Sequence, residues 1–531
     1  MAMTETRPEA EAPTATPPTS SASGSGLPRP ATGLAGLLGT GRHRSIGRLW
    51  IGTSLVFLVI SGALGGVIGA ERLKPETYNI LNKDNFAQTL SLHGVAGVFL
   101  FALPILIGIA TVVVPRQMGS HTIAFPRAAA LAFWGYLVGG GMVVVSYLIN
   151  GGPFGGNEKG VDLFLLSLAM VVASLVLASV CIATTVVGLR VKGLRLDRVP
   201  MFAWSMLVAT AIWIASLGIL FGLLVLLYID HRYRVFVYAA DDNISVWLRW
   251  TITSPQIFAM AIPVLGFVGD VVPVFGRTRA RMHNVQLAAI GAFGGLSFGA
   301  WTYLTFAHPK LPETAIYIGA AFAILLPMLA FTAATAETLR IGRIRLRSPL
   351  LFGIAALLLL LAGVVTGAIR VIHSFALVGT TADSSIIHFV AGATAIAAIG
   401  AIHYWWPHIL TRPLKEGLAS LSALVLLLGV AALSIPDIVS GFLDEPAGSL
   451  YTNVRDGVTA MNAVSLAGGA LVALGVALFV VNLAVSLARG GNDDAEAVDP
   501  WEGHTLEWAD DVSTITVASE APLLDAREGS A

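Results

Sequence analysis

Charged side chains are scarce in this sequence. Only 12% of its 531 residues are Asp, Glu, Lys or Arg, whereas 55% are hydrophobic, and soluble domains usually carry about a quarter charged residues. The 32 basic and 32 acidic residues give a net charge of zero. Because there is no excess of positive charge, no nucleic-acid partner is expected. This composition excludes an ordinary soluble protein and is typical of a chain that lies largely in a membrane.

Cysteine is almost absent as well. The one cysteine, Cys181, lies in an apolar stretch, so the chain can form no internal disulfide. The sequence also has no C-x-x-C-H motif for covalent attachment of a haem. Cys181 is therefore expected to pack as a small hydrophobic side chain.

Long apolar stretches dominate the sequence instead. Hydropathy predicts about twelve spans, each reaching the roughly 20 residues that cross a bilayer. They begin near Leu49, Thr89, Ala128, Leu163, Met201, Thr251, Val285, Ala315, Pro349, Ser384, Leu418 and Val458. We therefore expect an all-α membrane protein of about twelve transmembrane helices, with its transmembrane domain over residues 41–490.

The two ends of the chain differ from this core. Residues 1–40 are rich in Pro, Ser, Thr and Ala, so they are expected to form a disordered tail, and residues 491–531 form a second tail. Lys and Arg gather before the first span and after the even-numbered spans, as in Arg190, Lys192, Arg195 and Arg198. The positive-inside rule then places both termini in the cytoplasm. The expected location is a bacterial-type plasma membrane, which the chain crosses many times.

Two histidines lie within apolar spans. His93 is a few residues into the second span and His388 a few residues into the tenth. Both spans enter from the outer face, so both imidazoles lie about one to two turns below it. An imidazole without a partner in an apolar interior costs a few kcal/mol. Two neutral imidazoles at one depth could hold a haem iron from both sides. The alternative is two unrelated histidines, each bonded to a neighbouring group.

Several segments resemble the haem–copper oxidases, specifically cytochrome c oxidase subunit I. They include "SLHGVAGVFLFALPILIGIATVVVPRQMGSHTIAFPRAAALAFW", "GLRLDRVPMFAWSMLVATA" and "DPWEGHTLEW", and the similarity runs from about Arg42 to Trp508. The resemblance implies the subunit I arrangement of helices, with His93 and His388 as axial ligands of a low-spin haem. It also implies subunit II-like and subunit III-like partners, and cytochrome c or a quinol as the electron donor.

The chain departs from this family where the family reduces dioxygen. The three histidines that bind copper in the family correspond here to Ser254, Tyr303 and Leu304. The proximal histidine of the high-spin haem corresponds to Ile386. None of these residues supplies an imidazole, so no copper is expected. His308, one helical turn from Leu304, is the residue that could rebuild part of such a site.

Proton delivery and haem anchoring depart from the family as well. Gln256 stands where the family has a proton-passing glutamate, and Phe258 where it has a tyrosine. An amide cannot release a proton near neutral pH, and phenylalanine has no hydroxyl. The arginine pair that holds the haem propionates in the family is absent from "IPDIVSGFLDEPAG".

The sequence thus predicts a subunit I-like protein of respiratory electron transfer. It would keep one low-spin haem, of a type that the sequence does not define, on His93 and His388, and would have lost the dioxygen-reducing centre. No catalytic residue is assigned. Two alternatives stay open: a working terminal oxidase with a rebuilt metal site, and a haem-free structural or assembly paralogue.

Overall fold

The computed structural model describes most of the chain: residues 40–73, 81, 83–153, 155–234, 243–297, 318–410, 412–448, 457–488, 499–503 and 505–509. For residues 83–84 and 243–256 it describes the backbone alone. The chain divides into two units, Met1–Thr40 and Gly41–Ala531, and the account below concerns the second. The predictions for Tyr303, Leu304, His308 and the side chains of Ser254 and Gln256 lie outside the described residues, as does most of both tails.

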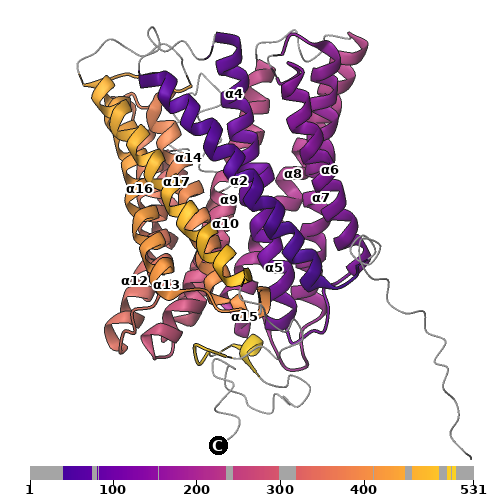
Figure 1. Ribbon diagram of the computed structural model, residues 1–531. Coiled ribbons are helices and arrows are strands. Elements are labelled where there is room, and N and C mark those ends of the chain that lie inside the picture. The colour runs from indigo at the N-terminus through magenta and orange to yellow at the C-terminus, as the bar shows by residue number, and fades with distance from the viewer. Residues whose placement is uncertain are drawn as a thin grey trace, which may run out of the picture. The chain divides into compact units, whose positions relative to one another are not determined.

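The described residues are almost entirely helical (Figure 1). The long helices are α2 (His43–Leu73), α4 (Lys83–Val95), α5 (Leu103–Gln117), α6 (Pro126–Leu148), α7 (Glu158–Gly188), α8 (Met201–Tyr233), α9 (Asn243–Gly276), α10 (His283–Ser297), α12 (Leu325–Ile341), α13 (Ser348–Arg370), α14 (Thr381–Tyr404), α16 (Glu416–Phe442) and α17 (Val458–Ala488). Short elements are the π-helix η1 (Ala96–Ala102), the turns η2 (Leu196–Arg198), η4 (His373–Phe375) and η5 (Leu506–Trp508), and α15 (Trp406–Ile409).

Eleven helices within the described ranges are long and apolar enough to cross a membrane. One of them, Asn85–Gln117, comprises α4, η1 and α5 in a continuous helix, and another, Ile318–Ile341, contains α12. The predicted seventh span begins as α10, which the structure describes up to Ser297. This arrangement confirms the predicted all-α membrane fold.

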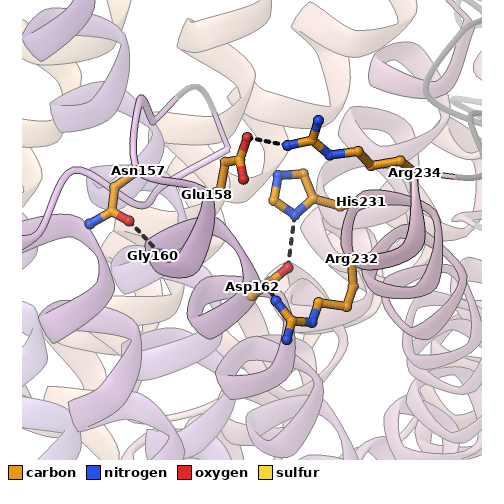
Figure 2. Close-up of polar contacts among 7 residues, drawn as sticks. All are labelled: Asn157, Glu158, Gly160, Asp162, His231, Arg232 and Arg234. Carbon is orange, nitrogen blue, oxygen red and sulfur yellow. Dashed lines mark hydrogen bonds and ion pairs between the residues drawn. The ribbon is translucent and has the colours of Figure 1, made fainter.

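The helices extend beyond the predicted apolar spans where polar side chains cap them. Helix α7 begins at Glu158 rather than near Leu163, because the Asn157 side chain accepts a hydrogen bond from Gly160 N at 3.3 Å (Figure 2). The same helix start is tied to the end of α8, as Figure 2 also shows. Arg234 donates to Glu158 at 2.8 Å, and His231 Nδ1 lies 2.8 Å from Asp162.

Helices differ in how deeply they lie in the bundle. The most apolar windows of Asn85–Gln117 and Ile257–Gly276 are each 94% buried, whereas that of Val458–Ala488 is 22% buried. The most apolar window of α14 is 72% buried, and this helix packs against α9, α13 and α16. Figure 1 shows α2 and α17 running on the side that faces the viewer. The second and tenth predicted spans, which carry the two candidate histidines, are therefore interior helices.

The two ends of this bundle are named here by their place in Figure 1. The upper end holds the start of α4 and the end of α2; the lower end holds α15 and the end of α5. Trp508 of the chain's last described segment is buried, and its Nε1 donates to the Tyr404 hydroxyl at 3.2 Å. Since Tyr404 ends α14, this part of the predicted C-terminal tail packs against the lower end of the bundle.

Candidate functional site

His93 lies near the end of α4 and is held by Ser61 of α2. The His93 Nδ1 atom is 2.8 Å from the Ser61 carbonyl oxygen and 3.2 Å from the Ser61 hydroxyl. The Ser61 hydroxyl in turn donates to the His93 carbonyl oxygen at 3.1 Å. A nitrogen that faces a carbonyl oxygen must carry the proton, so Nε2 is left as the basic nitrogen of the ring.

The backbone around His93 is also specialised. Gly65, one turn beyond Ser61 on α2, lies directly against the imidazole, and a Cβ at Gly65 would stand 2.9 Å from His93 Cε1. Immediately after His93 the helix widens into the π-helix Ala96–Ala102. Such π segments inside α-helices occur frequently at functional sites.

His388 lies two turns into α14 and is faced by Asp437 of α16. Its Nδ1 atom is 3.3 Å from Asp437 Oδ2, an ion-pair distance without hydrogen-bond alignment. The Asp437 side chain is only 3% exposed, and the Asp437 carbonyl oxygen accepts a hydrogen bond from Thr381 Oγ1 at 2.7 Å. The carboxylate thus lies beside Nδ1 of His388 without a hydrogen bond to it.

The structure brings the two predicted histidines into one region. Helix α14, which carries His388, packs against η1, which follows the helix of His93. In proteins, a histidine that binds a metal almost always donates its other ring nitrogen to a carboxylate or a backbone carbonyl. Here one ring has the carbonyl of Ser61 and the other has the carboxylate of Asp437. The residues present therefore fit an iron with two axial imidazoles.

The neighbouring region, where the family has its second haem, is packed with apolar side chains. Ile386 is fully buried and Phe258 is 2% exposed. The Phe258 ring meets Phe293 edge to face at 6.2 Å between centroids. It also approaches α13, where a Cβ at Gly367 would lie 3.5 Å from Phe258 Cζ. Among the described residues no cluster of three or more His, Cys, Asp or Glu side chains could hold a metal ion.

A second polar cluster at the lower end of the bundle was not foreseen from the sequence. The Gln117 amide donates to both Asp270 Oδ2 at 2.8 Å and Glu507 Oε1 at 2.9 Å. Trp405 Nε1 donates to the same Glu507 oxygen at 3.1 Å. Burial raises the pKa of Glu507 above its ordinary value. The only sequence signal for this contact was the run of apolar and acidic residues "TLEW" in the tail.

His408 of α15 belongs to the same end of the bundle. Arg116 hydrogen-bonds His408 Nδ1, and the ring packs against Trp508 at 4.8 Å between centroids. Burial, together with the charges of Arg116 and Arg44, lowers the pKa of His408 to about 3. His408 is therefore neutral, and it serves to dock the last described segment of the chain on the bundle.

Comparison with known proteins agrees with this architecture. Residues 45–471 match the family model described as cytochrome c and quinol oxidase polypeptide I. A provisionally named cytochrome c oxidase subunit 1-beta of Streptomyces avermitilis is 28% identical over 520 residues, which cover 92% of this chain and 91% of that one. A haem–copper oxidase subunit I+III of Aeropyrum pernix is also 28% identical, over 88% of this chain and 59% of its own length.

The fold is found among solved structures as well. A haem–copper terminal oxidase dimer solved by cryo-electron microscopy has a chain that matches this one with a TM-score of 0.71 at 15% identity, covering 86% of each. That likeness shows that the two chains share their fold. Because the family model covers most of the sequence, the chain belongs to the cytochrome c and quinol oxidase subunit I family.

Proposed function

We propose that this chain is a subunit I-like protein of respiratory electron transfer that binds one low-spin haem through His93 and His388. The observation that carries the proposal is that an oxygen atom lies beside Nδ1 of each ring. Each Nδ1 faces an oxygen atom of a neighbouring helix, the Ser61 carbonyl for one and the Asp437 carboxylate for the other. Each Nε2 is thereby left to bind iron.

The chain's own residues would set the properties of that site. The Ser61 carbonyl would hold the proton at Nδ1 of His93 and fix the plane of the ring, while the Asp437 carboxylate faces Nδ1 of His388. A haem held by these two imidazoles would supply a one-electron redox centre. The function proposed is therefore electron transfer through the membrane.

We further propose that the dioxygen-reducing centre is lost. Ser254, Tyr303 and Leu304 offer no imidazole for copper. Ile386 offers no ligand to a second iron, and its burial together with Phe258 supports an apolar interior at this point.

The proposed setting is a bacterial-type plasma membrane with both termini in the cytoplasm. The lower end of the bundle would then face the cytoplasm, because the basic residues of the even-numbered loops lie there. Subunit II-like and subunit III-like chains are the proposed partners, and the name of the Aeropyrum pernix relative joins subunits I and III in one protein. A cytochrome c or a quinol is the proposed electron donor.

The test is a visible spectrum with metal analysis of the protein purified from a haem-sufficient host. We expect one haem per chain, a six-coordinate low-spin spectrum, no stoichiometric copper and no cyanide-sensitive oxygen uptake. His93→Ala and His388→Ala should each abolish the low-spin spectrum. His373→Ala is the matched control, because His373 is exposed near the same end of the bundle; this variant should keep the spectrum.

Two outcomes would favour the other candidates. Stoichiometric copper together with cyanide-sensitive oxygen uptake would identify a terminal oxidase with a rebuilt metal site. Wild-type protein that carries no haem would identify a structural or assembly paralogue.

A further inference from the structure

A haem brings a problem of charge to any site that binds it. Its two propionate groups are anionic at neutral pH, and a buried carboxylate needs a cation or several hydrogen-bond donors. The arginine pair that serves this purpose in the family is missing from the sequence around Pro446. If the proposed haem is present, another group must meet the propionates.

Arg72 stands at the right place on α2. Ser61 and Gly65 contact His93, and Arg72 follows Gly65 by seven residues. Eleven residues separate Ser61 from Arg72, and this is about three helical turns, so all three residues lie along one face of the helix. Arg72 is about 10 Å further toward the upper end than Gly65, at about 1.5 Å per residue.

A loop after α16 contacts the helices of both histidines on the side of their upper ends. This roof loop (Leu443–Gly448) is fixed to the start of α14, because Thr381 N donates to the Glu445 carbonyl at 2.9 Å and Ala447 N donates to the Gly379 carbonyl at 2.8 Å. His388 lies about two turns below Thr381.

The far end of the roof loop reaches α4. A Cβ at Gly448 would lie 3.2 Å from Leu90 Cδ2, and Leu90 is one turn before His93. The roof loop therefore joins the helix of His388 to the helix of His93. Its buried Glu445 points to Arg72, with 3.6 Å between Glu445 Oε1 and Arg72 Nη2. This ion pair lies on the upper side of both histidines.

Two nitrogen atoms of the Arg72 guanidinium make no hydrogen bond to the described residues. Its side chain is 15% exposed, yet Nε and Nη2 are both buried without a hydrogen bond to any described residue. The 3.6 Å to Glu445 is beyond hydrogen-bond reach. Nε and Nη2 form the edge of a guanidinium that grips a carboxylate with two parallel hydrogen bonds.

Arg370, a buried arginine near this end, is already engaged. Its Nε is hydrogen-bonded to Asp383 Oδ1, and Asp383 Oδ2 accepts a hydrogen bond from Gly379 N at 3.1 Å. Arg370 is thus bound to a carboxylate of its own chain, whereas the corresponding edge of Arg72 is not.

We propose that Arg72 binds a propionate carboxylate of the haem held by His93 and His388, in place of the family's arginine pair. This inference rests on the proposed function. Glu445 positions the guanidinium from the roof loop, and Nε and Nη2 of Arg72 donate to the propionate.

The experiment compares haem with haem dimethyl ester, in which both propionate charges are removed. Full-length wild type, Arg72→Gln, Arg72→Lys and Arg370→Gln are made without haem, and each is titrated with either form while the low-spin spectrum is followed. Arg72→Gln should weaken haem binding by about ten- to a hundredfold, the amount expected for charge-assisted hydrogen bonds. It should leave binding of the ester unchanged, and Arg72→Lys should recover part of the loss. Arg370→Gln is the control: any change in its affinity relative to wild type should be the same for haem and for the dimethyl ester.

The outcomes separate this inference from the function on which it rests. Equal haem affinity in wild type and Arg72→Gln, or an equal loss for haem and for its ester, would overturn the role of Arg72 alone. Wild type that develops no low-spin spectrum with either form would overturn the haem proposal and this inference with it. The midpoint potential gives a second readout: loss of the cation beside a bound propionate should make it more negative in Arg72→Gln than in wild type, and an unchanged potential would contradict the contact.

Discussion

Replacing Gly65 with alanine should disturb His93 without disturbing the fold. A Cβ at Gly65 would stand 2.9 Å from His93 Cε1 and 3.3 Å from Nδ1, whereas ordinary contact begins at 3.4 Å. The ring must therefore move by about 0.5 Å. Its anchor is the bond of Nδ1 to the Ser61 carbonyl at 2.8 Å, and a shift of this size along the bond would stretch it past the usual limit of about 3.2 Å.

The expected loss follows from the energy of that bond. A hydrogen bond of this kind contributes about 0.5–1.5 kcal/mol, which corresponds to a loss of about two- to tenfold in haem affinity. Gly66→Ala is the matched control, because a Cβ at Gly66 meets nothing within 4 Å. Both variants change the intrinsic helix preference of α2 equally, so their difference isolates the contact with His93.

The assay is spectrophotometric titration with haem, together with thermal unfolding of both variants. Gly65→Ala should bind haem more weakly than Gly66→Ala and wild type, while the two alanine variants unfold at similar temperatures. Equal haem affinity in all three proteins would show that the ring position does not govern ligation, and the reasoning from Ser61 would fail.

Three further predictions concern protons. Because burial raises the pKa of Glu507 above its unfolded value of about 4.3, the resulting stabilisation is complete below about pH 4.3 and is lost as the pH rises through the folded pKa. Glu507→Gln should remove this alkaline loss in thermal unfolding at a series of pH values, and identical pH profiles would contradict it. The pKa of His408 is lowered to about 3. The stability that this contributes is complete above about pH 6.5 and falls by up to about 1.4 kcal/mol per pH unit as the pH drops toward 3. His408→Gln should make the loss of stability at acid pH less steep, and an unchanged steepness would contradict this. Protein in sealed vesicles with an electron donor should move no protons, and Gln256→Glu alone should restore none; internal pH that rises with electron flow would overturn the loss of the oxidase centre.

The membrane-spanning part of the fold could be predicted because lipid leaves few choices. Every backbone N–H and C=O must be bonded within the segment, so a long apolar stretch has to be a helix. Helix ends were less predictable: α7 starts five residues before Leu163 because Asn157 caps it, and hydropathy does not register a cap. Eleven spanning helices lie within the described residues, in the order predicted, and α7 shows that a predicted span can be too short at a polar end.

The contacts of the candidate site could not be predicted from the sequence. Spacing along each span predicts one level for His93 and His388, and this stays a prediction. The atoms that orient them, the Ser61 carbonyl and the Asp437 carboxylate, belong to other helices and depend on how each helix is rotated. The cluster of Gln117, Asp270 and Glu507 at the lower end was still harder to predict, because Glu507 and Gln117 are 390 residues apart in the sequence.

A buried histidine on the same helix as His388 shows how the two candidates differ from structural histidines. His403, four turns below His388 on α14, has both ring nitrogens engaged by the protein: Nδ1 bonds the Ile399 carbonyl at 2.8 Å and Nε2 lies 3.5 Å from the Asn482 amide. Its ring also stacks on Phe352 at 5.1 Å between centroids. Such a histidine is complete without a ligand.

His93 and His388 are not complete in this sense. The Ser61 carbonyl orients Nδ1 of His93, and the Asp437 carboxylate faces Nδ1 of His388 without a hydrogen bond. No described residue forms a hydrogen bond with Nε2 of either ring. The buried Asp437 carboxylate is costly to keep in a membrane helix unless it serves such an orientation. The proposed haem would explain why both rings lack a complete set of protein partners, since an iron held between them would supply the missing bonds.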